Sequence, residues 1–132
     1  MTDAEYEATK ARIQAALDKW VDTLGLKWWM ITYNWSRDSL PDAPSKEGWI
    51  GVAKVQVQWP YMTAQISFGV CDFQDDSDET IEFHVLHELM HIFLAEMKTP
   101  GKDASNHEER VATQLARAFQ WTWEAARQSP EP

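Results

Sequence analysis

The chain lacks the features that mark a secreted or membrane protein. Its single cysteine, Cys71, cannot form a disulfide within the chain. No apolar run approaches the roughly 18 residues of a membrane span, and the first residues lack the basic and apolar segments of a signal peptide. We therefore expect a soluble protein without a membrane partner, working in a reducing, cytoplasmic setting.

Basic residues are also scarce. The sequence has 12 Lys and Arg against 21 Asp and Glu, which gives a formal net charge of −9. Nucleic-acid binding draws its affinity from clustered positive charge, and here the basic residues are scattered along the chain. A glycine-rich phosphate loop is absent as well. We therefore expect no nucleic-acid partner and consider a neutral or basic polypeptide the better match.

Apolar periodicity predicts one α+β domain over residues 1–127 and a flexible tail over 128–132. Apolar residues at helical spacing, preceded by capping residues, indicate an N-terminal helix and two later helices. Alternating apolar residues indicate a small three-stranded sheet, whose last two strands form an antiparallel pair beside the first. The helices are expected at 2–24, 80–97 and 105–127, and the strands at 28–35, 49–59 and 62–70.

What the sequence does contain is a metal-binding motif. Residues 84–91 read H-V-L-H-E-L-M-H and include H-E-x-x-H at His87, Glu88 and His91. Residues four apart lie on one face of a helix, so both imidazoles can reach one ion. With a third protein ligand and a water, this makes a catalytic zinc site, in which Glu88 would act as general base toward the metal-activated water. Zn²⁺ is the expected cofactor.

The third ligand must lie downstream, where His107, Glu108 and Glu109 open the last predicted helix. Helical offsets from Glu108 reach an apolar stripe that should face the core, whereas those from Glu109 reach a small and polar stripe that should face solvent. The first stripe is Val111, Leu115 and Phe119, and the second is Ala112, Thr113, Ala116 and Gln120. We therefore predict Glu108 as the third ligand and Glu109 as a solvated charge.

Other roles remain open around this helix start. Ser105 lies three residues before Glu108, so the pair also matches a capping box. His107 could be a ligand or a donor to the oxyanion of the tetrahedral intermediate. His84 lies one turn before His87, and we assign it a supporting or structural role rather than direct ligation.

The order of these parts resembles the minigluzincins, small phage-type zinc metallopeptidases of the gluzincin clan. The resemblance covers nearly the whole chain. The segments L-G-L-K-W-W-M-I-T, H-V-L-H-E-L-M-H and H-E-E-R-V-A-T-Q-L-A carry it. It implies a zincin-like fold and a third zinc ligand on the helix after the motif, which carries over to Glu108. If the gene belongs to a phage, the compartment is the host cytoplasm.

The resemblance also implies a substrate site beside the metal. In such a fold an edge strand borders the cleft and can hold an extended peptide by strand addition, and the candidate is one of the two strands between Trp49 and Val70. Larger gluzincins have a Tyr or His that stabilises the transition state. Tyr33, Tyr61 and His107 are the candidates here.

The sequence thus predicts a zinc-dependent peptidase that hydrolyses peptide bonds, with the metal on His87, His91 and Glu108 and with Glu88 as base. The alternative is a zinc-binding regulatory or interaction protein that has the same fold and little or no proteolytic activity. A metzincin is disfavoured because no third motif histidine follows His91, and a metal-dependent nuclease because no basic surface is present.

Overall fold

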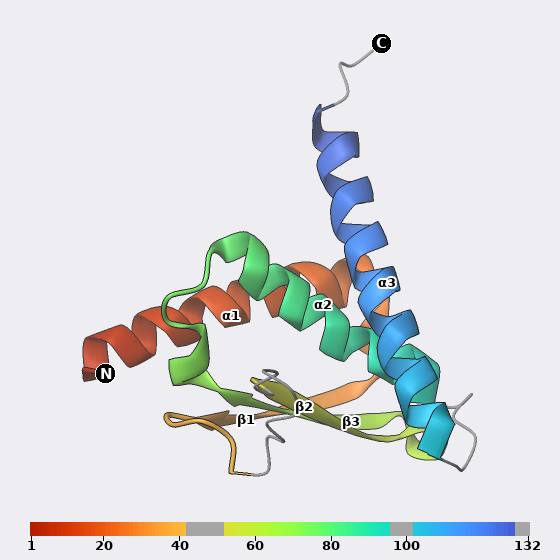
Figure 1. The fold of residues 1–132 in the computed structure, drawn as a ribbon, viewed down its shortest axis with the longest axis horizontal. Helices are drawn as coiled ribbons and strands as arrows, with labels where there is room; N and C mark the ends of the chain where they lie inside the picture. The colour runs from red at the N-terminus through yellow and green to blue at the C-terminus, as the bar shows by residue number, and fades with distance from the viewer. Residues whose placement is uncertain (42–51, 96–101, 129–132) are drawn as a thin grey trace.

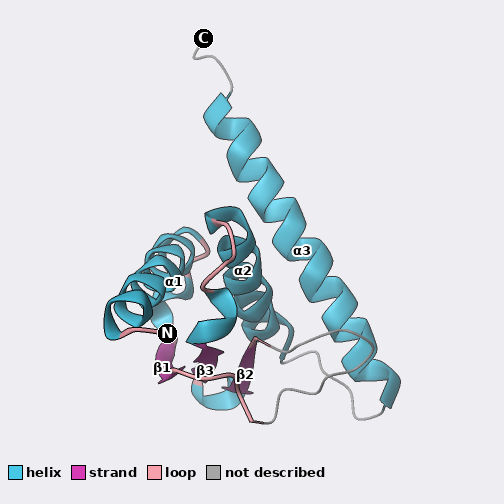
Figure 2. Ribbon diagram, turned by 60° about the vertical axis from the view of Figure 1, so that its left-hand side comes forward, coloured by secondary structure: helices cyan, strands magenta, loops and turns pink. Residues whose placement is uncertain are grey.

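A computed structural model of the protein has an α+β fold (Figure 1). It describes residues 1–41, 52–95 and 102–128, with only the backbone of 102–107. Within these ranges, two helices cover one face of a three-stranded sheet, and a third helix packs beside the second and extends beyond it (Figures 1 and 2). The helices are α1 (Asp3–Thr23), α2 (Asp78–Leu94) and α3 (Lys102–Gln128), and the strands are β1 (Met30–Ser36), β2 (Ala53–Gln58) and β3 (Thr63–Gly69).

The sheet has the order β1-β3-β2, with β1 parallel and β2 antiparallel to the central strand β3. Ile66 at the centre of β3 pairs with Tyr33 on β1 and with Val55 on β2. The predicted antiparallel pair is therefore confirmed, and of its two strands β2 is the one at the sheet edge. The first strand begins two residues later than predicted, because Leu26–Trp28 form a short 3₁₀ helix.

The helix α1 follows the sequence prediction closely. Thr2 and Glu5 form the expected capping box, in which each side chain accepts a hydrogen bond from the other residue's backbone N–H. Ile13, Leu17 and Trp20 are fully buried on the face toward the core. Periodicity and capping agree here, so local sequence was sufficient to define the helix.

The helix α2 lies at the centre of the molecule and contacts α1, α3 and β2. Ser77 caps its first turn by accepting the N–H of Thr80. Both the apolar face and part of the motif face are buried, as Val85, Leu89 and His91 show. A helix covered on two sides holds its side chains in fixed positions, which suits a site that must bring several ligands together.

The helix α3 packs with a different face from the one predicted. The fully buried positions are Ala112 and Ala116, whereas Val111 and Leu115 are half-buried and Phe119 is 40% exposed. The small alanines let α3 approach α2 closely, because the distance between packed helices depends on the side chains at the contact. The prediction that the stripe of Ala112, Thr113, Ala116 and Gln120 faces solvent is therefore wrong, because Ala112 and Ala116 are buried and the other two are half-buried.

The start of α3 also differs from the prediction. The helix begins at Lys102, so Ser105 lies inside it and the capping-box interpretation of Ser105 and Glu108 is wrong. At its other end α3 extends past the body of the molecule (Figure 2). Trp121 in this part of the helix is exposed. In the described ranges, no helix is both long and apolar enough to cross a membrane.

The close contact between α2 and α3 can be tested with two matched substitutions. Ala112→Leu is expected to lower the free energy of unfolding by about 1–3 kcal/mol, because a larger side chain must displace α3 from α2. Ala118→Leu, at an exposed position of the same helix, should change it by less than about 0.5 kcal/mol. Urea unfolding of both variants measures the difference. Equal effects at the two positions would contradict the observed helix face.

Candidate metal centre

Two helices bring three potential metal ligands together. His87 and His91 lie one turn apart on α2, and Glu109 reaches them from α3. The Nε2 atoms of the two histidines are 3.2 Å apart. Glu109 places Oε2 at 2.9 Å from His87 Nε2 and Oε1 at 3.0 Å from His91 Nε2. The three side chains thus point their ligand atoms at one small volume.

This donor set suits zinc. Two imidazoles and one carboxylate are a known ligand combination of catalytic zinc sites. Ligand atoms about 2.1 Å from a zinc ion at tetrahedral angles lie roughly 3.4 Å apart, which is close to the separation of the two Nε2 atoms. Three protein ligands leave one coordination position open, as hydrolysis requires. The residues present therefore fit a zinc ion of the catalytic kind.

The other ring nitrogen of each histidine also has a partner on α3. His91 Nδ1 lies 2.9 Å from Glu108 Oε1, and His87 Nδ1 lies 3.1 Å from Thr113 Oγ1. A histidine that donates its Nδ1 proton to such a partner presents Nε2, without a proton, to a metal. One helix thus supplies a candidate ligand and two side chains that orient the histidine rings.

The two neighbouring glutamates of α3 have different positions. Glu109, which the sequence analysis assigned to solvent, contacts both Nε2 atoms although its side chain is 60% exposed. Glu108, the predicted ligand, contacts the Nδ1 side of His91 and is largely buried. The geometry therefore favours Glu109 over Glu108 as the third ligand. The difference follows from the rotation of α3 that buries Ala112 and Ala116.

Thr113 was predicted only as part of the stripe that faces solvent, and its contact with His87 was not predicted. The available signal was its spacing, since Thr113 lies one turn after Glu109 and so shares its helix face. The alanines at 112 and 116 were a second signal, because small residues repeated one turn apart favour close helix packing on that side. Read together, they would have placed Glu109 and Thr113 at the contact with α2.

In the absence of a metal, charge and burial shift the pKa of several groups in the cluster. Burial lowers the pKa of His91, but hydrogen bonds to Glu109 and Glu108 and the charge of Glu88 outweigh this effect and raise it to about 9. The pKa of Glu109 falls far below its usual range, because His87 and His91 both hydrogen-bond to its carboxylate. The metal-free cluster thus holds a proton where a cation would bind.

Glu88 is the acidic residue of the motif, and it is buried next to this cluster. Only 9% of it is exposed, and burial raises its pKa to about 8, with an opposing effect from His91 and a further increase from Glu109. Its carboxyl group is therefore mainly protonated at neutral pH when no metal is bound. A cation at the cluster would favour the ionised form, since opposite charge lowers the pKa of a carboxyl group.

These shifts predict how the stability of the metal-free protein depends on pH. Folding raises the pKa values of Glu88 and His91 above their usual values of 4.5 and 6.5, so the folded chain binds these protons more tightly than the unfolded chain does. Their stabilising contribution is complete below those values and is lost as pH rises through about 8 and about 9. In a chelator, unfolding free energy should therefore fall by at least about 1 kcal/mol between pH 6 and pH 9, lowering Tm by a few degrees. A Tm that rises over this interval would contradict the assignment.

The role of Thr113 gives a second prediction. Thr113→Val removes the hydroxyl group that faces His87 Nδ1 and should weaken zinc binding by about 10–100-fold, the usual effect of losing a side chain that orients a ligand. Thr113→Ser keeps the hydroxyl group and should restore most of the affinity. Competition with a chromophoric zinc chelator measures both. Equal affinities for the valine and serine variants would exclude this role.

The remaining predicted residues lie outside the cluster or outside the described side chains. His84 contacts the rings of Phe73 and Phe83, with centroid distances of 5.6 and 5.7 Å, and burial lowers its pKa. Tyr33 packs on the inner face of β1, and Tyr61 is exposed in the turn between β2 and β3. The side chain of His107 is outside the described residues. None of the described candidates contacts the three clustered ligands, so none is identified as a transition-state stabiliser.

Comparisons of the chain with family models, with curated proteins and with solved structures gave no match.

Proposed function

We propose that the protein is a zinc-dependent peptidase with His87, His91 and Glu109 as metal ligands and Glu88 as general base. The observation that carries the proposal is the convergence of three ligand atoms within 4.8 Å of one another. The buried carboxyl group of Glu88, which follows His87 in the sequence, supports it, because the charges of His91 and Glu109 affect its pKa. The proposal rests on these side chains and not on the fold, because the same fold can carry many different functions.

A zinc ion bound there supplies the Lewis acidity that activates water for attack on a carbonyl group. The chain's own residues then perform the proton transfers. Glu88 accepts a proton from the attacking water and donates it to the nitrogen of the leaving amine, so that the peptide bond is replaced by a carboxylate and an amine. Glu108 and Thr113 keep the two imidazoles in the ligating tautomer and orientation throughout.

The position of β2 supports a polypeptide as the substrate. This strand is at the edge of the sheet, so the outer side of its backbone has no neighbour among the described strands. It also contacts α2, which carries His87 and His91. An extended peptide added to that edge would form main-chain hydrogen bonds and pass close to the metal helix. A zincin-like core, in which this edge borders the cleft, is part of the proposal.

The function test compares turnover with metal binding. The zinc-loaded protein should cleave an unfolded, fluorescently labelled casein, and a chelator should stop the reaction until zinc is restored. A protein that holds one equivalent of zinc and shows no turnover would instead be a zinc-binding regulatory or interaction protein.

A further inference from the structure

The face of the sheet opposite the helices has an unusual composition. Apart from Met30 and Lys54, the outward positions of the three strands carry amide and hydroxyl side chains, and the strands contain no acidic residue, although the whole chain has 21. Register places Gln65 in the centre, with Thr32 on one side and Gln56 on the other. Among the residues of the three described strands, this face carries one charged side chain, Lys54, on a strongly acidic protein.

The outer face is also hollowed. A shallow depression of about 310 Å³ is lined by Met30, Thr32, Gln56, Gln58, Thr63 and Gln65, with the backbone of the central strand between them. This volume is at the lower end of the range for pockets that hold small ligands, about 300–1,000 Å³. The hollow is formed by three strands, which are more rigid than loops and better able to hold side chains in place.

The amide groups that line the hollow have unused hydrogen-bonding capacity. Gln56, Gln58 and Gln65 make no side-chain hydrogen bond to any part of the chain that the structure describes. Each amide offers two donor hydrogens and an oxygen that can accept two hydrogen bonds. The hollow therefore presents donors and acceptors in similar numbers and almost no charge, which is the complement of a ligand rich in hydroxyl groups.

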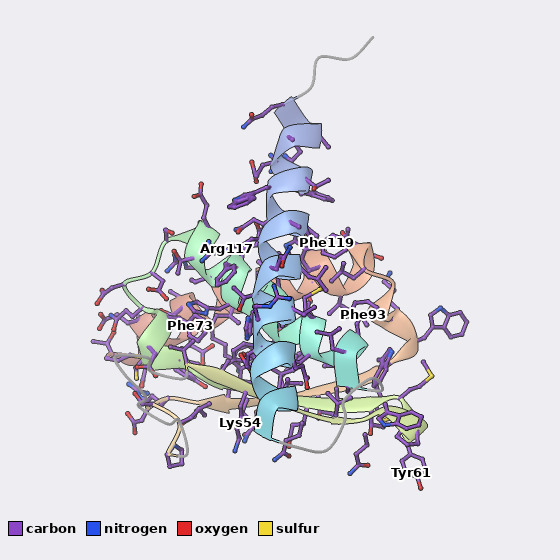
Figure 3. All side chains as sticks on the ribbon, turned by 45° about the vertical axis from the view of Figure 1, so that its right-hand side comes forward. Lys54, Tyr61, Phe73, Phe93, Arg117 and Phe119 are labelled. Atoms are coloured by element: carbon purple, nitrogen blue, oxygen red, sulfur yellow. The ribbon has the colours of Figure 1, made fainter. Side chains whose placement is uncertain are left out.

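The turn that leads out of the hollow, between Gln58 and Thr63, carries exposed aromatic side chains. Trp59 and Tyr61 belong to the turn that joins Gln58 to Thr63, and the side chain of Tyr61 projects away from the body of the molecule (Figure 3). Tyr61 is 77% exposed. Trp28, 86% exposed, lies just before Met30, whose N–H donates to the carbonyl of Met62 in that turn. Apolar rings beside a polar hollow provide flat surfaces for the apolar faces of a ligand, in addition to its polar groups.

From these observations we propose that the outer face of the sheet binds a neutral oligosaccharide. Sugar hydroxyl groups pair with the amides of Gln56 and Gln65, and the C–H faces of a β-linked pyranose lie on Tyr61 or Trp59. A nucleic acid matches less well, because its phosphates require clustered cations and the strands supply one lysine. This site is on the face opposite α2, and the proposal does not depend on the function of the metal centre.

The test is isothermal titration of the full chain with cellotetraose and with tetra-N-acetylchitotetraose, two neutral β-linked probes. At least one should bind with a Kd of about 1 mM or lower. Gln65→Ala should weaken it by about 2–10-fold, as expected for one lost hydrogen bond, and Tyr61→Ala should weaken it further. Gln114→Ala, at an exposed glutamine of α3, should not. If Gln65→Ala unfolds, Gln56→Ala on the edge strand replaces it.

Several results would overturn the proposal. These are the absence of binding by both sugars at about 10 mM, affinities unchanged in Gln65→Ala, Gln56→Ala and Tyr61→Ala, or binding of a thymidine decanucleotide in place of the sugars. A dimer in sedimentation that Tyr61→Ala dissociates would assign the face to self-association instead. Glu109→Ala should bind sugar like the wild type. A failure of the peptidase proposal and a failure of the sugar-binding proposal can therefore be told apart.

Discussion

Replacing Glu109 with alanine is expected to remove the bound zinc. Glu109 contacts both Nε2 atoms, at 2.9 and 3.0 Å, so its loss would leave two imidazoles to hold the ion. The expected fall in zinc affinity exceeds the roughly 10–100-fold loss that follows removal of an orienting residue, and the metal should be lost on desalting. Elemental analysis of the purified protein gives the stoichiometry, and chelator competition gives the affinity.

Glu108→Ala is the matched comparison, because it removes the neighbouring carboxylate, which contacts His91 on the Nδ1 side. It should lower zinc affinity within that roughly 10–100-fold range and leave about one equivalent bound at high zinc. Glu124→Ala, at an exposed position near the end of α3, should have no effect. If Glu108→Ala loses the metal and Glu109→Ala keeps it, the original sequence prediction of Glu108 is correct and the geometric assignment fails.

This pair of substitutions also shows where sequence reasoning reached its limit. The motif on α2 could be predicted because its three residues are linked by one helical turn, so local geometry places His87 and His91 together. The third ligand is on another helix, and its identity depends on the rotation of α3 about its axis. A rotation of one residue exchanges Glu108 for Glu109, and apolar periodicity alone did not determine it.

The rotation of α3 about its axis depends on how closely it packs against α2, and the spacing of apolar residues in the sequence does not report this. The predicted stripe contained the larger apolar side chains, Leu115 and Phe119, and hydrophobicity alone would bury them. In the fold, α3 is buried through Ala112 and Ala116, because α2 already occupies the space that larger side chains would need. The shape of α2 therefore decides which residues of α3 are buried, and the sequence of α3 alone gives no information on that shape.

The strands show the same limit. Alternation predicted β2 and β3 and their antiparallel pairing, since one short turn joins them. It could not predict that β3 is central and that β1 pairs with it in parallel, because that pairing requires a long crossover connection whose path depends on the whole fold. The sequence therefore could not show which of the two strands, β2 or β3, lies at the edge of the sheet, where a peptide could add. Only the three-dimensional structure identifies it as β2.

Glu88 connects the electrostatics of the site with its proposed chemistry. Burial keeps its carboxyl group mainly protonated near neutral pH, with a pKa of about 8, while no cation is present. Zinc binding should release protons, from His91 because a ligating imidazole must be neutral and from Glu88 because positive charge favours the carboxylate. The base would thus become available only when the metal is in place.

Glu88→Gln is accordingly expected to abolish peptidase activity while zinc remains bound. Glutamine has nearly the same shape as glutamate but cannot accept the proton from water, so kcat should fall by at least about 10²–10⁴-fold. Zinc stoichiometry should stay at one equivalent, since Glu88 is not among the clustered ligands. Cleavage of labelled casein and elemental analysis on the same preparation measure both quantities.

The state of Glu88 makes this substitution a clean test of mechanism. Because the wild-type carboxyl group is mainly neutral in the metal-free protein, a neutral amide should leave its stability at pH 6 nearly unchanged, and the loss of activity will not reflect unfolding. Glu79→Gln, exposed at the start of the same helix, should retain full activity. Cleavage that persists in Glu88→Gln would remove Glu88 as the base, and zinc binding without cleavage in the wild type would favour the binding protein over the enzyme.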